Sequence, residues 1–237
     1  SMGDMARLAR NTETAFRVDF HSLVPDVDQL YWRGIVFHYF DGRTWKNEPR
    51  RINQTQALKG DKKVSYSIML EPHNKNWLFA LDHPVEASDF TRILRERVLW
   101  TDTRVKERIQ YNVTSVLRTE GESLSDDDMK YIYLEGKGNP RTSALAREWK
   151  AVSDSTEEFV ELALAYFSNN SFVYSLEPPL LYDHLIDDFL FRTRSGYCEH
   201  YASAFAFLMH EAEIPARVVG GYRGGELNPY GDFLTVR

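Results

Sequence analysis

Apolar residues in this chain follow two different spacings, and the change between them constrains the fold more than any other feature. In the first half they recur at every second position, as in Phe16, Val18 and Phe20 and again from Val64 to Leu70. A repeat of two is typical of strands with one buried face. In the last hundred or so residues the repeat lengthens to that of amphipathic helices, so the chain is predicted to be an α+β protein.

Short polar turns separate the predicted strands. Asp41-Gly42 lies between the apolar segment 35–40 and Thr44-Trp45, and a polar turn at 74–76 precedes the apolar residues of 77–81. A further strand is predicted at 109–113. Short strands joined by such turns favour an antiparallel sandwich or barrel.

The two parts meet at Gly136–Pro140, where two glycines and an Asn-Pro step argue against one continuous element. We therefore predict an N-terminal antiparallel β-rich domain over residues 1–138 and a second domain over residues 139–237. In the second domain, helices are predicted at 142–152, 156–167 and about 182–191, with Asp154 or Ser155 as the N-cap of the middle one. Asp187 and Asp188 are adjacent in the sequence, so their carboxylates are expected to point apart and to face solvent.

Charge and cysteine content exclude several classes of function. The net charge is −6 without a clustered basic stripe, so nucleic acid is not an expected partner. No apolar run approaches the roughly 20 residues that cross a bilayer. A single cysteine allows no internal disulfide and no multi-cysteine zinc module.

That cysteine, Cys198, follows Ser195-Gly196-Tyr197 and begins an amphipathic stretch that is predicted to form a helix over 198–212, ended by Pro215. A thiol in the first turn of a helix lies among unpaired backbone N–H groups, at the positive end of the helix dipole. Both favour the thiolate, which is the attacking species. A lone cysteine is more often a small buried apolar residue, so its neighbours must decide.

Those neighbours resemble the transglutaminase-like superfamily, and more closely its bacterial membrane-anchored branch. The resemblance lies in Asp188–Phe191, Arg194–Phe205, Ala212–Val219, Gly221-Tyr222 and Gly224–Pro229, and in Leu30–Gly34 and Phe40–Trp45 of the β-rich part. It implies that residues 139–237 form the helical half of a transglutaminase-like, papain-like core.

The resemblance also implies a reaction. Cys198 attacks a glutamine-type carboxamide, ammonia or an amine leaves, and the thioester passes to a lysine amine or to water, as in a protein-glutamine gamma-glutamyltransferase. Tyr197, Glu199 and His200 are expected to shape the substrate and oxyanion site. No cofactor is expected, and no metal, because Cys198 and His200 lack the neighbours that would complete a zinc set.

In that family a histidine and an aspartate complete the triad on later strands, and this chain reaches Arg237 before them. We therefore expect the 237-residue chain alone to be inactive. His200 lies about 200° around the helix from Cys198, and His210 about 18 Å along it, so neither is expected to act as the base. His184 is expected to be a surface histidine.

The last predicted strand, Phe233–Val236, is expected to be an unpaired edge. A second copy of the chain or a complementary C-terminal fragment would then cover it. The family branch implies membrane helices that flank these residues, a location at the periplasmic face of the inner membrane of a Gram-negative bacterium, and a protein or cell-envelope peptide as substrate.

Two other functions stay open. The same fold could serve a cysteine hydrolase, either a peptidase or an amidase. Alternatively, the chain could be a non-catalytic periplasmic binding module whose surface is formed by Tyr31, Trp32, Tyr39 and Trp45, although aromatic residues at strand spacing are more often core.

Overall fold

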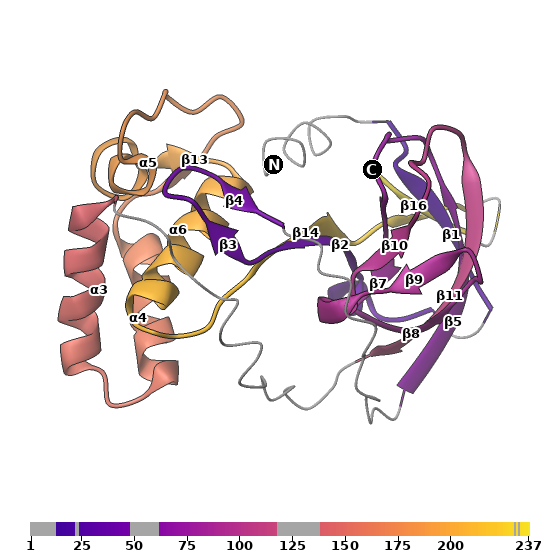
Figure 1. The fold of residues 1–237 in the computed structure, drawn as a ribbon, viewed down its shortest axis with the longest axis horizontal. Helices are drawn as coiled ribbons and strands as arrows, with labels where there is room; N and C mark the ends of the chain where they lie inside the picture. Colours follow the sequence, from indigo (N-terminus) through magenta and orange to yellow (C-terminus); the bar gives the residue numbers. More distant parts are fainter. Residues whose placement is uncertain (1–12, 22–23, 48–61, 118–137, 230, 232) are drawn as a thin grey trace. The chain divides into compact units, whose positions relative to one another are not determined.

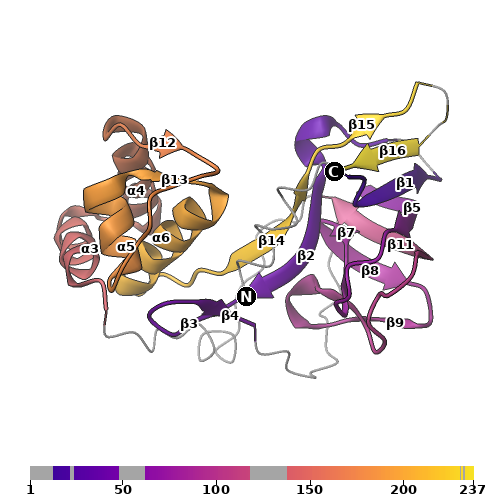
Figure 2. The same ribbon diagram turned by 90° about the horizontal axis from the view of Figure 1, so that it is seen from above.

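The structure is a computed structural model that describes residues 13–21, 24–47, 62–117, 138–229, 231 and 233–237. Contacts group the chain into two compact units. The β unit contains the described residues of 3–36, 49–123 and 219–237, and the helical unit contains those of 37–48 and 124–218. Both units can be followed in Figures 1 and 2.

The β unit is built on a six-stranded antiparallel sheet with the strand order β15-β16-β1-β5-β11-β8. Its strands are β1 (Phe16–Phe20), β5 (Lys62–Leu70), β8 (His83–Ala87), β11 (Ile109–Leu117), β15 (Glu226–Leu227) and β16 (Phe233–Val236).

Two smaller sheets complete the β unit, with the orders β6-β10-β9 and β14-β2-β7. The strands are β2 (Tyr31–Phe37), β6 (Trp77–Leu78), β7 (Ala80–Leu81), β9 (Thr91–Ile93), β10 (Leu99–Thr101) and β14 (Val218–Arg223). Two short 3-10 turns lie at Val27–Gln29 and Arg95–Arg97.

The predicted alternation of buried and exposed residues is confirmed in the main sheet. Phe16, Val18 and Ile68 are fully buried, and Tyr66 and Tyr111 lie beside them in the core. The buried tyrosine hydroxyls pair with the backbone: Tyr66 Oη accepts the N–H of residue 81 at 2.6 Å, and Tyr111 Oη donates to the carbonyl of residue 79 at 2.8 Å. These bonds satisfy polar groups that would otherwise be costly to bury.

The predicted unpaired edge at Phe233–Val236 is wrong. β16 lies between two strands, because it pairs with β15 on one side and with β1 on the other, in the register Phe16↔Val236 and Val18↔Leu234. The N-terminal strand β1 therefore takes the position that we had assigned to a second copy or a separate fragment. This pairing brings together strands from near the two ends of the chain, and no local sequence pattern predicts it.

The helical unit contains three longer helices, α3 (Pro140–Val152), α4 (Thr156–Asn169) and α6 (Cys198–Glu211). All three were predicted, and the Oγ of Ser155 caps α4 by accepting the N–H of Glu158 at 3.1 Å. The helix predicted at about 182–191 is instead a short turn, α5 (Leu185–Asp187), that continues as a π-helix over Asp188–Thr193. The remaining elements are the strands β3 (Tyr39–Phe40), β4 (Trp45–Lys46), β12 (Val173–Tyr174) and β13 (Ser195–Gly196).

Two segments depart from the predicted division after residue 138. The hairpin of β3 and β4 belongs to the helical unit, and residues 219–237 belong to the β unit. The hairpin packs on α6: Trp45 Nε1 donates to Ser203 Oγ at 2.7 Å, and the ring of Phe40 meets that of Phe207 edge-on at 5.7 Å. The turn at Asp41-Gly42 was predicted correctly, but its partner lies far along the sequence.

Asp187 is not on a solvated face, contrary to expectation. Its side chain is buried, and its carboxylate accepts the N–H groups of Arg141 and Thr142 at 3.0 and 2.8 Å, at the start of α3. In return, Asn139 Oδ1 accepts the N–H groups of Ile186 and Asp187 at 2.9 and 3.2 Å. The start of α3 and the α5 turn therefore hold each other through two side chains. Asp188 behaves as predicted to the extent that it forms a surface pair with Arg192, whose hydrogen bond lowers the pKa of Asp188 to about 2.

Two of the four residues suggested for the surface of a binding module, Trp32 and Trp45, are buried. Trp32 is 0% and Trp45 1% exposed, and the two residues lie in different units. Both indole nitrogens are also engaged, that of Trp32 with the carbonyl oxygen of Gly224 at 2.8 Å. No helix in the described part of the chain is long and apolar enough to span a membrane.

Candidate functional site

Cys198 is the first residue of α6, and its side chain is exposed. The preceding residue, Tyr197, is extended (φ −108°, ψ −177°) and forms the N-cap. The positive end of the helix dipole and the backbone N–H groups of the first turn stabilise negative charge that develops beside this thiol. The predicted position of the cysteine in a first helical turn is confirmed.

The chain that leads into α6 is fixed by a neighbouring strand. β13 pairs in parallel with β12: the N–H of Val173 donates to the carbonyl of Arg194, and the N–H of Ser175 to that of Gly196, both at 2.8 Å. Arg194 adopts a left-handed conformation (φ 46°), and its N–H donates to the carbonyl of Phe189 at 2.9 Å. The π-helix therefore ends in a sharp turn, and β13 then leads directly to Cys198.

His200 folds back over the start of its own helix. Its Nδ1 accepts the N–H of Tyr197 at 3.3 Å, and its ring lies edge-on to the ring of Tyr197, with 4.5 Å between the centroids. The other side of the imidazole faces Phe189 at 5.6 Å. A Cβ atom on Gly196 would lie only 2.7 Å from His200 Cγ, so this ring requires a glycine at position 196.

Burial lowers the pKa of His200, and a hydrogen bond with the backbone of Tyr197 opposes this effect only in part. The neutral ring that results can accept a hydrogen bond at Nδ1 and carries its hydrogen on Nε2. His200 is therefore built to hold the turn before Cys198.

Glu199, the second residue of α6, is partly buried beside the nucleophile. Burial raises the pKa of its carboxyl group, and a hydrogen bond with Tyr197 opposes that rise. Its Oε2 is buried and has no hydrogen-bond partner among the described residues. Tyr197, Glu199 and His200 thus form one group around the start of α6.

The other histidines of the helical unit have different environments. His210 Nε2 lies 2.6 Å from the carbonyl oxygen of Ala216, near the far end of α6, and burial lowers its pKa. His184 is exposed, and its Nδ1 accepts the N–H of Asn139 at 3.3 Å. His38 is buried at the start of the β3–β4 hairpin. Within the described residues, no group of three or more His, Cys, Asp and Glu side chains could hold a metal ion.

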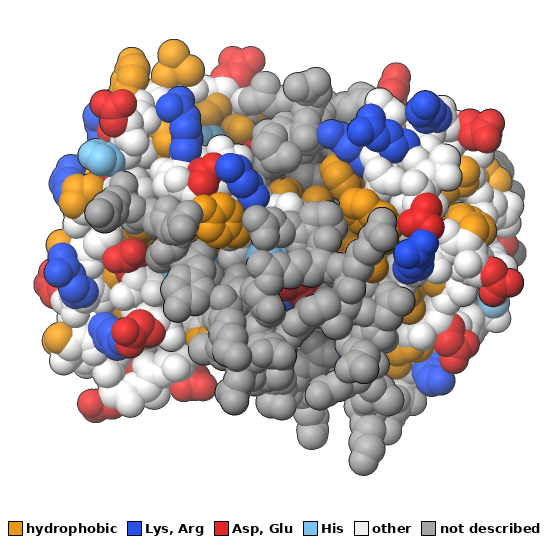
Figure 3. Space-filling view, in the orientation of Figure 1, with side chains coloured by type: hydrophobic (Ala, Val, Ile, Leu, Met, Phe, Trp, Pro, Cys, Tyr) orange, Lys and Arg blue, Asp and Glu red, His pale blue; other side chains and the backbone are white. Residues whose placement is uncertain are grey.

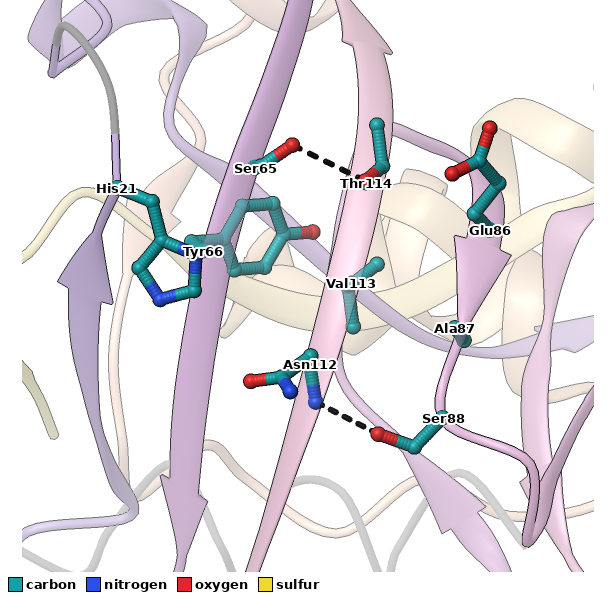
Figure 4. A pocket seen from close by; sticks show the side chains of 9 residues that line it. All are labelled: His21, Ser65, Tyr66, Glu86, Ala87, Ser88, Asn112, Val113 and Thr114. Atoms are coloured by element: carbon teal, nitrogen blue, oxygen red, sulfur yellow. Dashed lines mark hydrogen bonds between the residues drawn. The ribbon is translucent and has the colours of Figure 1, made fainter.

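A second candidate is a shallow cavity of about 350 Å³ in the β unit, lined by polar side chains of β5, β8 and β11 (Figure 4). Ser65 Oγ and Thr114 Oγ1 lie 3.0 Å apart there, and Ser88 Oγ accepts the N–H of Asn112 at 2.9 Å. These bonds join neighbouring strands on the polar face of the sheet.

His21 at the rim of this cavity lies 2.7 Å from Ser67 Oγ, which invites comparison with a serine nucleophile and its base. The hydroxyl of Ser67, however, donates to Asn112 Oδ1 at 2.8 Å. Since that bond uses the only hydroxyl hydrogen, His21 Nε2 must be the donor in its own bond. His21 is therefore not a base for Ser67, and the exposed thiol of Cys198 at the start of α6 remains the candidate reactive group.

Comparison with known proteins identifies the family of this chain. The family model of the TgpA N-terminal domain matches residues 1–122, and that of the transglutaminase-like superfamily matches residues 143–235. A protein-glutamine gamma-glutamyltransferase of Pseudomonas aeruginosa is 40% identical over 239 residues, which are 99% of this chain and 36% of the relative. The chain thus spans about a third of the length of that curated relative.

Two crystal structures of the periplasmic domain of TgpA from Pseudomonas aeruginosa have the same fold. One superimposes with a TM-score of 0.91 at 38% identity and covers 99% of this chain and 83% of the solved one. The other, bound to ethylmercury, has a TM-score of 0.88 at 40% identity and covers 99% and 85%. These matches confirm the predicted fold class and the predicted correspondence to a periplasmic domain.

Proposed function

Because this chain belongs to the TgpA family of transglutaminase-like proteins, we propose that it carries out acyl transfer with Cys198 as the nucleophile. Acyl transfer is the activity supported for the family, through the relative named protein-glutamine gamma-glutamyltransferase. The observation that carries the proposal for this chain is the exposed thiol at the first residue of α6. The proposed substrate is a glutamine-type carboxamide.

In the first half of the reaction, the sulfur of Cys198 bonds to the carboxamide carbon, and the carbonyl π electrons move to oxygen. When the tetrahedral intermediate collapses, the C–N bond breaks and the nitrogen takes up a proton, so ammonia leaves and a thioester remains. The backbone N–H of Cys198 is the proposed donor to the oxyanion, because it lies at the positive end of α6.

Three neighbours have proposed supporting roles. Tyr197 and Glu199 line the approach to the thiol and hydrogen-bond to each other. His200 keeps Tyr197, and with it the start of α6, in the geometry that directs the oxyanion donors. None of the three is proposed as the base.

The proposed general base is none of the histidines that the structure describes. All seven histidines of the chain fall within the described residues, and those of the helical unit are the capping His200, the distant His210, the surface His184 and the buried His38. A general base must approach the thiol within hydrogen-bond reach. We expect the whole protein to supply a histidine, with an aspartate to orient it, and the 237 residues alone to show little or no turnover.

The second half of the reaction has two possible acceptors. A lysine amine gives an isopeptide bond, whereas water gives glutamate, and both proceed from the same thioester. The relative's name favours the amine, and hydrolysis as a peptidase or amidase is the alternative. A binding module without catalysis has less support, because the indoles of Trp32 and Trp45 are buried.

For the whole protein we propose anchoring through membrane helices outside these residues, and a protein or cell-envelope peptide as substrate on the periplasmic side. A separate C-terminal fragment that supplies the missing triad residues is also compatible with this scheme. It would have to bind elsewhere than at β16, since both sides of that strand are paired.

The test is a product analysis with the whole protein, a glutamine peptide and a primary amine. Mass spectrometry separates the amine adduct from the glutamate product. We expect the adduct to dominate at high amine concentration and to disappear in the Cys198→Ala variant. Glutamate alone, at every amine concentration, would establish the hydrolase instead. Products that persist in Cys198→Ala would overturn the assignment of the nucleophile.

A further inference from the structure

The strand β12 is tied directly to the segment that carries the nucleophile. Its two hydrogen bonds to β13, from the N–H groups of Val173 and Ser175, end only two to four residues before Cys198. Figure 2 shows β12 and β13 side by side at the start of α6. A chain bound along β12 would therefore lie at a defined distance from the thiol.

Large apolar side chains are exposed along this strand and the loop that follows it. Figure 3 shows hydrophobic side chains at the upper edge of the helical unit, where Figure 1 draws this loop. The exposed fractions are 58% for Val173, 63% for Tyr174, 51% for Leu176, 78% for Leu180 and 63% for Tyr182. A concentration of exposed apolar residues is typical of an interaction surface.

Tyr174 is exposed but held in place. Its ring stacks on that of Tyr201, which follows Cys198 by one turn of α6, with 6.4 Å between the centroids and 20° between the planes. Tyr182 is backed in a similar way by the guanidinium of Arg192, which lies 5.3 Å from its ring. Rigid aromatic side chains bind partners at a low cost in conformational entropy.

One edge of β12 is not paired with another strand of the described residues. In a parallel pair, the N–H and C=O of alternate residues face the neighbouring strand. Because Val173 and Ser175 face β13, the N–H and C=O of Tyr174 face the opposite side. The described sheet contains only β12 and β13, so no described strand covers that side.

The geometry points to β12 as the docking strand for the acyl-donor polypeptide, which would bind in extended form with apolar or aromatic residues next to its glutamine. Pairing with Tyr174 would supply main-chain hydrogen bonds, and the side chains of Val173, Tyr174 and Leu176 would select apolar neighbours of the glutamine. The inference rests on the proposed function for the identity of the glutamine side chain, but not for the docking itself.

The chemistry of the strand favours a polypeptide over other occupants. Residues 171–176 carry no charge, so they offer neither an anion nor a cation site. An exposed strand edge matches the spacing of peptide groups in an extended chain. The surface also lies on the strand that pairs with β13, which leads to the nucleophile.

A labelling experiment on the whole protein tests the docking without turnover. Two peptides carry a chloroacetamide in place of the glutamine side chain, one flanked by Leu and Phe and the other by Gly and Ser, and chloroacetamide itself is the third reagent. The rate of alkylation of Cys198 is followed by intact mass. We expect the apolar peptide to react about tenfold faster than the polar peptide at equal, subsaturating concentration.

Two variants of Tyr174 separate the contribution of its side chain to docking from that of its backbone. Tyr174→Ala should reduce the preference for the apolar peptide to within about threefold, and Tyr174→Pro, which also removes the outward N–H, should slow both peptides further. Chloroacetamide should react equally with both variants and with the wild type. Leu164→Ala, which changes an exposed leucine of α4, is the matched control and should retain the full preference.

An unchanged preference in Tyr174→Ala would overturn the inference, as would an equal loss with all three reagents, because the latter reports damage to the site. The same holds if the whole protein buries Tyr174 under its own chain, which protection of that residue from mild iodination would reveal. If the preference is found but no amine adduct forms, the proposed acyl transfer fails while the docking strand stands.

Discussion

The Nδ1 atom of His200 accepts a hydrogen bond from the backbone N–H of Tyr197 at 3.3 Å, so a side chain within α6 fixes the residue that precedes the nucleophile. The bond is local, yet it controls the first helical turn, in which Cys198 and its N–H lie. A misplacement of catalytic groups by about 1 Å can cost a factor of 100 in rate. The activity should therefore depend on His200 even though it is not the base.

The first prediction separates the acceptor atom of His200 from the volume of its ring. His200→Asn, whose Oδ1 can still accept the Tyr197 N–H, should keep the activity of the whole protein within about fivefold. His200→Phe keeps the ring but has no acceptor, and it should lower kcat about 10- to 100-fold with little change in KM. Steady-state kinetics of amine incorporation measure both values.

If His200 were the base instead, both variants would be inactive. No pH dependence of kcat could then be measured for them, whereas we predict that His200→Asn has the same pH dependence of kcat as the wild type. Equal activity of His200→Phe and the wild type would show that the capping bond does not control the site.

The second prediction concerns the contact between Gly196 and His200. A Cβ at position 196 would approach the imidazole to 2.7 Å, so Gly196→Ala should cost about 1–3 kcal/mol of stability and also lower activity. In a His200→Ser background the same change should cost less, because the contact with Cγ at 2.7 Å is gone, although the contact with the Cβ of residue 200 at 2.8 Å remains. Urea unfolding of the four proteins of this cycle gives the coupling, and additive costs would contradict the predicted contact.

The third prediction tests the clamp between Asp187 and the start of α3. Asp187→Ala removes the acceptor for the N–H groups of Arg141 and Thr142 and for the Thr142 hydroxyl, so it should destabilise the protein by about 2–3 kcal/mol. Asp187→Asn, which keeps one acceptor oxygen, should cost less. The exposed Asp183→Ala is the control, with an expected effect below about 0.5 kcal/mol. Chemical denaturation checks all three, and equal effects of Asp187→Ala and Asp183→Ala would refute the clamp.

The fourth prediction is a pH dependence in the β unit. Burial lowers the pKa of His73 from 6.5 to about 4, and its Nδ1 accepts the N–H of Lys75. The unfolded chain therefore binds a proton more readily than the folded one between these two values. Stability is unaffected by this group above about pH 6.5 and falls as the pH drops toward 4.

The variant His73→Phe keeps an aromatic ring against Trp77, which stacks on His73 at 5.8 Å. Between pH 7 and pH 5 the wild type should lose about 1–2 kcal/mol more of its free energy of unfolding than this variant does. Parallel pH dependences of the two proteins in urea would show that His73 does not titrate in this way.

Local sequence signals predicted the elements around the nucleophile. Ser195-Gly196 and Pro215 bracket α6, and Ser155 caps α4, because turns, caps and stops act within a few residues. The placement of Cys198 at a helix start follows from such signals alone. The family resemblance adds the proposal that this cysteine is a nucleophile.

Three of the errors concern contacts between distant residues. Adjacent carboxylates were expected to face solvent, but the α5 turn directs Asp187 to α3, which begins 47 residues earlier in the sequence at Pro140. The β3–β4 hairpin reads as part of the β-rich half, yet Trp45 bonds to Ser203 of α6. β16 pairs with β1 from the opposite end of the chain. Local propensity and residue spacing do not predict these partners, because the pairing depends on how the whole fold buries its side chains.

The central claim, that Cys198 forms a thioester with a glutamine carboxamide, is tested most directly by trapping that intermediate. The whole protein is mixed with a glutamine peptide without amine, quenched in acid within seconds, and digested for mass spectrometry. We predict an adduct on the fragment that contains Cys198, with the mass of the peptide less one ammonia, which hydroxylamine removes and which Cys198→Ala lacks. Release of ammonia at an undiminished rate with no adduct on Cys198, or an adduct on another residue, would contradict the account.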